Sequence, residues 1–188
     1  MKKLLKNFGP LVLIVAVIIV LDQWTKSLVL ANIPLNSIWR YGDWPISWFR
    51  FVYVQNTGVA FGMFQGSETM STIFTILPFF VSAMIIYYYT QVPNPDWALR
   101  LALSMQLGGA IGNLVDRLTL GFVVDFVSVG KFPVFNVADA CITCGVGVLL
   151  LDMWLEERRE KLAREAAEVE AADDVMVDSG TVDEAISS

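Results

Sequence analysis

The residues of this sequence best suited to chemistry are four aspartates within or beside long apolar runs. Three have polar neighbours within about one helical turn, and the fourth, Asp125, has only valines and a phenylalanine beside it. The three groups are Asp22 with Lys26, Asp116 with Asn113 and Arg117, and Asp139 with Asn136. The sequence contains no histidine, which excludes Ser-His-Asp and Cys-His catalysis and histidine-ligated zinc. Two carboxylates that share one proton can activate water for hydrolysis, one as base and one as acid.

The elements that must position these groups are long apolar segments. A helix needs about 20 mostly apolar residues to cross the hydrocarbon core of a bilayer. Four segments qualify, at about residues 8–27, 70–90, 97–117 and 134–154. We expect the first to be a retained span rather than a cleaved signal peptide, because no small-x-small site follows it and the run continues into Asp22-Gln23-Trp24-Thr25-Lys26. With 55% apolar residues, we expect an all-α membrane protein with four transmembrane helices rather than a soluble bundle.

Basic residues beside the spans predict how the chain is oriented. Eight of them flank the N-terminus, the second loop and the end of the fourth span: Lys2, Lys3, Lys6, Arg100, Arg158, Arg159, Lys161 and Arg164. The opposite side has Arg40, Arg50, Arg117 and Lys131, with Lys26 at a span end. We therefore expect both termini in the cytoplasm, and residues 32–69 and 118–133 outside.

This orientation brings the polar residues to one depth. Asp22 and Lys26 fall in the outer third of the first span, and Asp116 and its neighbours fall at the outer end of the third. Asn136 and Asp139 begin the fourth span, and Asp125 lies in the loop before it. Ionisable groups inside spans are costly and usually functional, so the pattern predicts a site at the outer membrane face.

Most of these residues also have a purely structural interpretation. Asp22 and Lys26 could simply pair at i,i+4, and Lys26 could also hold Asp116. Asn136 could cap the fourth helix, with Asp139 at its third position. Gly108, Gly109 and Gly112 favour close helix packing, and Cys141 and Cys144 are interpreted as small buried apolar residues. Asp125 has no such explanation, because a lone acid in an apolar loop has no evident packing role.

Two segments lie outside the spans. Residues 32–69 include the strand-like run Phe51–Gln55 and the turn Asn56-Thr57-Gly58 before Val59–Phe64, with Trp39, Trp44, Trp48 and Phe49 suited to the headgroup region. We expect a small sheet there. Residues 156–188 form an acidic tail that we expect to be cytoplasmic and largely disordered, although its start could extend the fourth helix. This leaves 1–155 as the membrane domain. Residues 152–188 carry most of the acidic excess, and no basic surface favours nucleic acid.

Five short motifs occur in a fixed order. They are Asp22-Gln23-x-Thr25-Lys26, Asn56-Thr57-Gly58-x-Ala60-Phe61-Gly62, Gly112-Asn113-x-x-Asp116-Arg117, Val124-Asp125-Phe126 and Phe135-Asn136-x-Ala138-Asp139. Together they resemble lipoprotein signal peptidase, the type II signal peptidase of bacteria, from about Lys6 to Trp154. The connection between Asp125 and Asp139 is short for this family, and the acidic tail is not part of its pattern.

The resemblance implies an aspartyl endopeptidase of the bacterial cytoplasmic (inner) membrane, with four membrane helices and a periplasmic β-cradle. It would remove the signal peptide from diacylglyceryl-modified prolipoproteins, just before the lipidated cysteine, in contact with membrane lipids. It implies Asp125 and Asp139 as the catalytic pair, with Asp22, Lys26 and Asp116 as supporting polar residues. The substrate-binding residues it implies are Asn56, Asn113, Arg117 and Asn136. Neither a metal nor a cofactor is expected, and the cyclic peptide globomycin is the expected inhibitor.

Two other functions compete with a peptidase. A proton- or ion-coupled transporter would also place ionisable residues inside spans, but it predicts them through the full membrane depth. Here the inner halves of the spans contain few besides Arg100 and Gln106. A scaffold whose polar cluster only locks helix packing would leave Asp125 unexplained.

Overall fold

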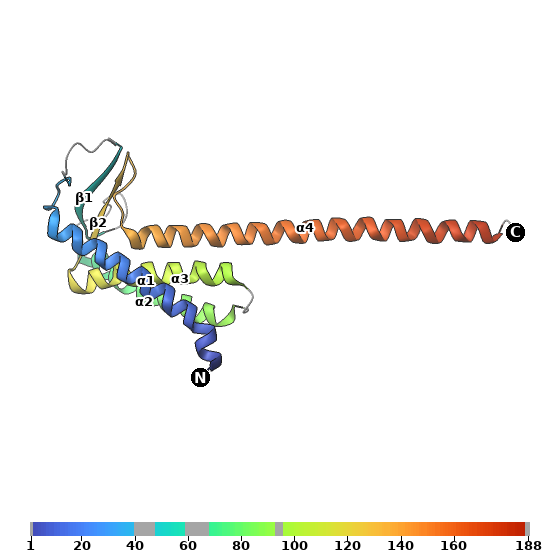
Figure 1. Ribbon diagram of the computed structural model, residues 1–188, viewed down its shortest axis with the longest axis horizontal. Coiled ribbons are helices and arrows are strands. Elements are labelled where there is room, and N and C mark those ends of the chain that lie inside the picture. Colours follow the sequence, from blue (N-terminus) through green and yellow to red (C-terminus); the bar gives the residue numbers. More distant parts are fainter. Residues whose placement is uncertain (1, 40–47, 59–67, 93–95, 187–188) are drawn as a thin grey trace. The chain divides into compact units, whose positions relative to one another are not determined.

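The computed structural model describes residues 2–39, 48–58, 68–92 and 96–186. Within them the chain forms four helices and a two-stranded sheet (Figure 1). The order is α1 (Lys2–Asn32), β1 (Phe49–Asn56), α2 (Glu68–Gln91), α3 (Trp97–Thr119), β2 (Val123–Val129) and α4 (Val137–Ile186). Each apolar segment predicted from the sequence forms a helix, but α4 begins three residues later than expected and α1 extends further at both ends.

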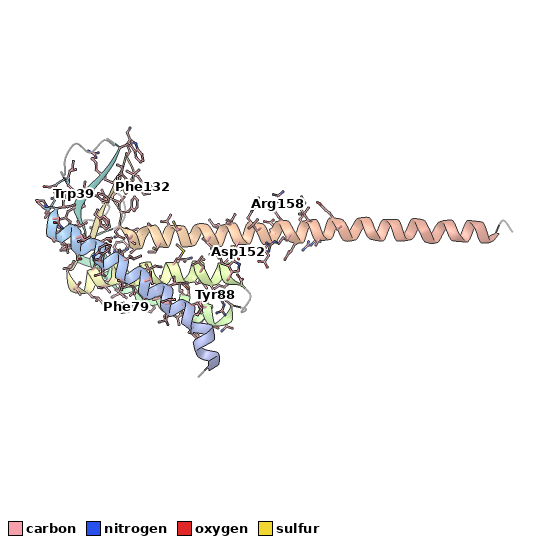
Figure 2. The ribbon with its side chains drawn as sticks, in the orientation of Figure 1. Trp39, Phe79, Tyr88, Phe132, Asp152 and Arg158 are labelled. Carbon is pink, nitrogen blue, oxygen red and sulfur yellow. The ribbon has the colours of Figure 1, made fainter. Side chains whose placement is uncertain are left out.

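Three helices are long and apolar enough to cross a membrane: Phe8–Asn32, Thr72–Gln91 and Val137–Ala166. Their side chains are largely exposed in the isolated chain, as Phe79 and Tyr88 of α2 illustrate (Figure 2). Such exposure of large apolar groups suits contact with lipid. Helix α3 does not meet the same apolar criterion among the described residues, although the sequence predicts it as a span. It carries Arg100, Asn113, Asp116 and Arg117, and much of its surface is buried by protein instead.

Helix α3 packs closely against α1 and the start of α4 at its glycines. A Cβ atom on Gly108 would lie 3.0 Å from Ile18 of α1, and one on Gly109 would collide with the carbonyl oxygen of Ala138. On α4, a Cβ atom on Gly145 would lie 2.9 Å from the carbonyl oxygen of Ala102. The predicted role of glycines in close helix packing is therefore confirmed for Gly108 and Gly109.

The sheet confirms one predicted strand and corrects one predicted loop. Strand β1 contains the expected Phe51–Gln55 run, whereas the segment around Asp125, expected to be a loop, is strand β2. The strands pair antiparallel, with Val54 opposite Asp125 and a register shift between Phe51 and Val54. Val124 and Phe126 pack with Val29, Ile33 and Tyr53, so the valine-rich sequence of β2 covers the C-terminal end of α1. The predicted run Val59–Phe64 and Trp44 lie outside the described residues.

The C-terminal residues also differ from expectation. The sequence predicts a largely disordered tail over residues 156–188, but α4 continues as a helix through Ile186. Alanine, glutamate, lysine and arginine are strong helix formers. Exposed i,i+4 pairs join Lys161 to Glu165 and Glu160 to Arg164, and the Arg158 guanidinium lies over the Trp154 ring. Leu150–Ser188 forms a compact unit separate from Met1–Leu149.

Candidate active site

A buried charge cluster joins α1 to α3. The Lys26 ammonium lies 2.8 Å from Asp22 Oδ2 and 2.9 Å from Asp116 Oδ2, and all three side chains are at most 2% exposed. The predicted pairing of Lys26 with both acids is therefore confirmed. Buried ions are tolerated only when geometry is good and further hydrogen bonds complete their shells, and this cluster has both.

Each acid of the cluster also holds the backbone directly before another aspartate. Asp116 Oδ2 accepts a hydrogen bond of 3.0 Å from the Val124 N–H, which precedes Asp125 on β2. Asp22 Oδ1 accepts one of 3.0 Å from the Ala138 N–H, which precedes Asp139 on α4. The cluster thus fixes the strand that carries Asp125 and the helix that carries Asp139.

Asparagine side chains bring Asp125 and Asp139 into one network. Asn56 Nδ2 donates to Asp125 Oδ2 at 2.9 Å, and Asn136 Nδ2 donates to Asp125 Oδ1 at 2.8 Å. Asn113 Nδ2 donates to Asp139 Oδ1 at 2.7 Å, while Asn113 Oδ1 accepts from Asn136 Nδ2 at 3.0 Å. The predicted catalytic pair is therefore joined through Asn113 and Asn136.

The direction of each amide is set by a partner that can only donate. Lys26 Nζ donates to Asn113 Oδ1 at 3.0 Å, the Asp139 N–H to Asn136 Oδ1 at 2.9 Å, and the Gly58 N–H to Asn56 Oδ1 at 3.0 Å. An ammonium or a backbone N–H must face oxygen. Each NH₂ group therefore points at a carboxylate of the pair.

Asp139 caps the start of α4 together with Asn136. The Asn136 N–H donates to Asp139 Oδ2 at 3.2 Å, and the Asp139 N–H donates back to the Asn136 side chain. This is a reciprocal capping arrangement, so the predicted cap is present. It does not remove Asp139 from the network, because its other oxygen receives the Asn113 NH₂ group.

The carboxyl group of Asp125 has a strongly raised pKa. It is 3% exposed, and its burial, reinforced by the charge of Asp139, raises its pKa from 3.8 to about 7. Hydrogen bonds from Asn56 and Asn136 and the charge of Lys26 act in the opposite direction. A carboxyl group with a pKa near neutrality is suited to proton transfer.

Two further residues complete the description. Arg117 is half-buried and close enough to Asp139 and Asp125 for their charges to interact, but none of the described contacts of its side chain is a hydrogen bond or ion pair. Gln23 lies beside the charge cluster, and it makes no described hydrogen bond with Asp125, Asp139 or the three asparagines. Its Nε2 donates to Asp116 Oδ1 at 2.8 Å and to the Gly112 carbonyl at 3.2 Å. Its position between Asp22 and Lys26 in the first motif is the sequence feature from which its contact with the cluster could have been predicted.

Gly112 leaves room for this arrangement. A Cβ atom there would lie 2.8 Å from Asp22 Oδ2, so the glycine accommodates a carboxylate and not only a neighbouring helix. Cys141 and Cys144 are free thiols, and the expectation that both are buried is wrong, because Cys141 is only partly buried and Cys144 is exposed. Within the described residues, no three histidine, cysteine or acidic side chains are grouped as metal ligands would be.

Comparisons with known proteins agree with this site. The family model described as signal peptidase (SPase) II matches residues 14–155. Lipoprotein signal peptidase of Syntrophotalea carbinolica is 38% identical over 84% of this chain and 98% of its own, and that of Shewanella loihica is 36% identical over 78% and 86%. A bacterial membrane enzyme solved by the in meso method at 2.3 Å resolution superposes with a TM-score of 0.70 at 25% identity, covering 79% of this chain and 90% of that one. By the extent of these matches, the chain belongs to the signal peptidase II family.

Proposed function

We propose that this protein is a membrane aspartic endopeptidase that removes the signal peptide from diacylglyceryl-modified prolipoproteins, just before the lipidated cysteine. The observation that carries the proposal is the joining of Asp125 and Asp139 by Asn113 and Asn136 within a chain of this family. A transporter has no comparable support, because the described ionisable network is confined to one end of the helices, with Arg100 bonded at the other.

The surroundings of the two aspartates favour different roles. Asp125 has the raised pKa and is the member that carries the shared proton. Asp139 lies in the first turn of α4, where the helix dipole favours negative charge, and acts as the base. It takes a proton from water as the water oxygen attacks the scissile carbonyl carbon, and Asp125 gives its proton to the carbonyl oxygen.

Collapse of the resulting tetrahedral diol completes the reaction. Asp139 passes the proton it gained to the amide nitrogen, and the C–N bond breaks to release the new amine. The second diol proton returns to Asp125 as the new carboxyl group forms, so both aspartates regain their starting states. These steps require no metal or cofactor. Asn56, Asn113 and Asn136 hold the aspartates, and their remaining hydrogen-bonding capacity would bind substrate backbone.

Arg117 is the side chain we propose for direct substrate binding. A half-buried guanidinium has up to five N–H donors, and its described contacts leave them available beside the pair. Peptide carbonyl groups near the cleavage site are costly to leave without donors in a low-dielectric environment. Arg117 would meet that requirement.

The membrane arrangement is part of the proposal. We infer that α3 is the fourth span, packed against α1, α2 and the start of α4, because its length matches the other spans and its Asn113 and Asp116 side chains are paired internally. The distribution of basic residues supports a cytoplasmic position for both termini and a position of the pair at the outer face of the bacterial cytoplasmic membrane. The apolar surfaces of α1 and α2 would contact membrane lipids.

One assay tests this function. The purified protein in detergent is incubated with a diacylglyceryl-modified prolipoprotein, and the released signal peptide is identified by mass spectrometry. A matched substrate with serine in place of the lipobox cysteine, which cannot receive the lipid, is the control. We expect cleavage of the lipidated substrate alone, before its cysteine. No cleavage, or equal cleavage of both substrates, would contradict the proposal.

A further inference from the structure

Lys26 is connected to both members of the aspartate pair although it touches neither. Its three N–H donors meet three acceptors, Asp22 Oδ2 at 2.8 Å, Asp116 Oδ2 at 2.9 Å and Asn113 Oδ1 at 3.0 Å. An ammonium group has three donors, so its capacity is fully used. The side chain is 2% exposed, and water does not compete for these positions.

Every one of these acceptors leads to a catalytic aspartate in one further step. Asn113 donates to the Asp139 carboxylate. Asp22 holds the Ala138 N–H, next to Asp139 in the chain. Asp116 holds the Val124 N–H, next to Asp125. The Lys26 ammonium is therefore linked to Asp139 in two ways, through Asn113 and through Asp22, and to Asp125 in one way, through Asp116.

We propose that Lys26 is the positioning residue of the aspartate pair: its ammonium group sets the direction of the Asn113 amide and the spacing of β2 and α4, and thereby the geometry in which the pair shares a proton. This inference rests on the proposed function. A misplacement of about 1 Å in a catalytic group costs on the order of 10²-fold in rate, so the effect on turnover should be large.

The same residue influences the electrostatics of the pair. The charged groups that face Asp125 are Asp139 on α4, Arg117 on α3 and Lys26 on α1. Lys26 lowers the pKa of Asp125, against the larger effects of burial and Asp139 that bring it to about 7. Loss of the ammonium charge should therefore raise the pKa of Asp125 further. A residue that only supported the fold would not move this titration in the folded protein.

The test compares Lys26→Met with Gln23→Leu. Both variants weaken the support of Asp116, but Gln23 makes none of the described contacts with Asn113. For Lys26→Met we expect kcat on lipidated substrate to fall about 10- to 100-fold, with KM within about threefold. The alkaline limb of its pH profile should move upward. Gln23→Leu should lower thermal stability and keep kcat within about threefold, and Lys26→Arg should recover part of the lost kcat.

A charge-balanced variant covers the case in which Lys26→Met does not fold. Removing the ammonium leaves Asp22 and Asp116 as buried charges, which is strongly destabilising. Asp22→Asn with Lys26→Met removes one charge of each sign and keeps an oxygen for the Ala138 N–H. We expect the same fall in kcat from this double variant. Wild-type kcat and pH profile in folded Lys26→Met or the double variant would overturn the proposal.

A readout without substrate separates this inference from the proposed function. Difference infrared spectroscopy follows the carboxylic acid band of Asp125 during a pH titration, with Asp125→Asn used to assign the band. We expect the band to titrate at higher pH in the Lys26 variants than in wild type and Gln23→Leu. An unchanged titration would refute the role of Lys26 even in an active enzyme. A shifted titration in a chain without cleavage activity would refute the proposed function alone.

Discussion

Replacing Asp125 by asparagine should make the folded protein less sensitive to alkaline pH. Burial and Asp139 raise the pKa of Asp125 from 3.8 to about 7, so between these values the folded state binds more protons than the unfolded state. The free energy of unfolding of wild type must then fall as pH rises through this window. A rise of about three pH units, at about 1.4 kcal/mol for each, gives a loss of about 4 kcal/mol. The loss is absent below about pH 4 and complete above about pH 7.

Asparagine does not titrate, so the Asp125→Asn variant should escape this loss. It has its own cost, because its NH₂ group must face either Asn56 or Asn136, both of which donate to Asp125. A mismatched buried donor costs about 1–3 kcal/mol, but this cost does not vary with pH. The stability of the variant relative to wild type should therefore increase by about 4 kcal/mol between about pH 4 and pH 8.

The assay is equilibrium unfolding in detergent, followed by tryptophan fluorescence, at half-unit steps from pH 4 to 8.5. Glu160→Gln is the control, because Glu160 is exposed on the part of α4 that lies in the separate C-terminal unit. Its curve should run parallel to that of wild type. If the Asp125→Asn curve also ran parallel to wild type, Asp125 would not have the raised pKa, and its role as the proton-carrying member would be refuted.

Three further predictions concern the support of the site, its sidedness and its inhibition. Gly112→Ala places a methyl group about 2.8 Å from Asp22 Oδ2, so it should destabilise the protein by about 1–3 kcal/mol and lower kcat. The control Gly147→Ala, with nothing within 4 Å of the added Cβ atom, should do neither. Equal melting temperatures of the two variants would contradict the close packing at Gly112. In a variant lacking Cys141 and Cys144, the substitution Leu35→Cys should give a thiol that reacts with an impermeant maleimide in intact cells, whereas Lys161→Cys should react only after lysis. The reverse pattern would mean that the chain has the opposite orientation in the membrane. Globomycin should compete with lipidated substrate and lose affinity in Arg117→Ala; undiminished cleavage at saturating inhibitor would point to a different site.

Much of the fold could be predicted because the relevant signals are local. Each helix follows from one apolar run, and strand β1 follows from an aromatic and β-branched run before a turn. Strand β2 was missed because its stability is non-local. Val124 and Phe126 are buried against α1 and β1, and a short valine-rich segment does not reveal that partner. The full length of the tail helix was missed for another reason, since the end of the tail was judged by its lack of apolar groups rather than by its helix propensity.

The candidate site, like the fold, could be predicted from the sequence only where the signal is local. Because helices fix the depth of each residue, the sequence could bring Asp22, Asp116 and Asp139 to one membrane face. It could not show that Asp116 and Asp22 hold the backbone before Asp125 and Asp139, because backbone N–H groups carry no sequence signal. Nor could it give the directions of the three amides, which depend on contacts between distant segments such as Lys26 with Asn113.

The most direct test of the central claim is the single-turnover cleavage rate of Asp125→Asn and Asp139→Asn on lipidated prolipoprotein. An amide keeps size and polarity but cannot exchange a proton with water, and loss of acid–base catalysis costs about 10²–10⁴ in rate. Each single variant should fall by at least about 10²-fold, and the double variant should be little worse, because the pair acts as a unit. The new side chain in Asp139→Asn would still cap α4, so a purely structural Asp139 predicts near-normal cleavage. Substantial turnover by either single variant would contradict a two-aspartate mechanism.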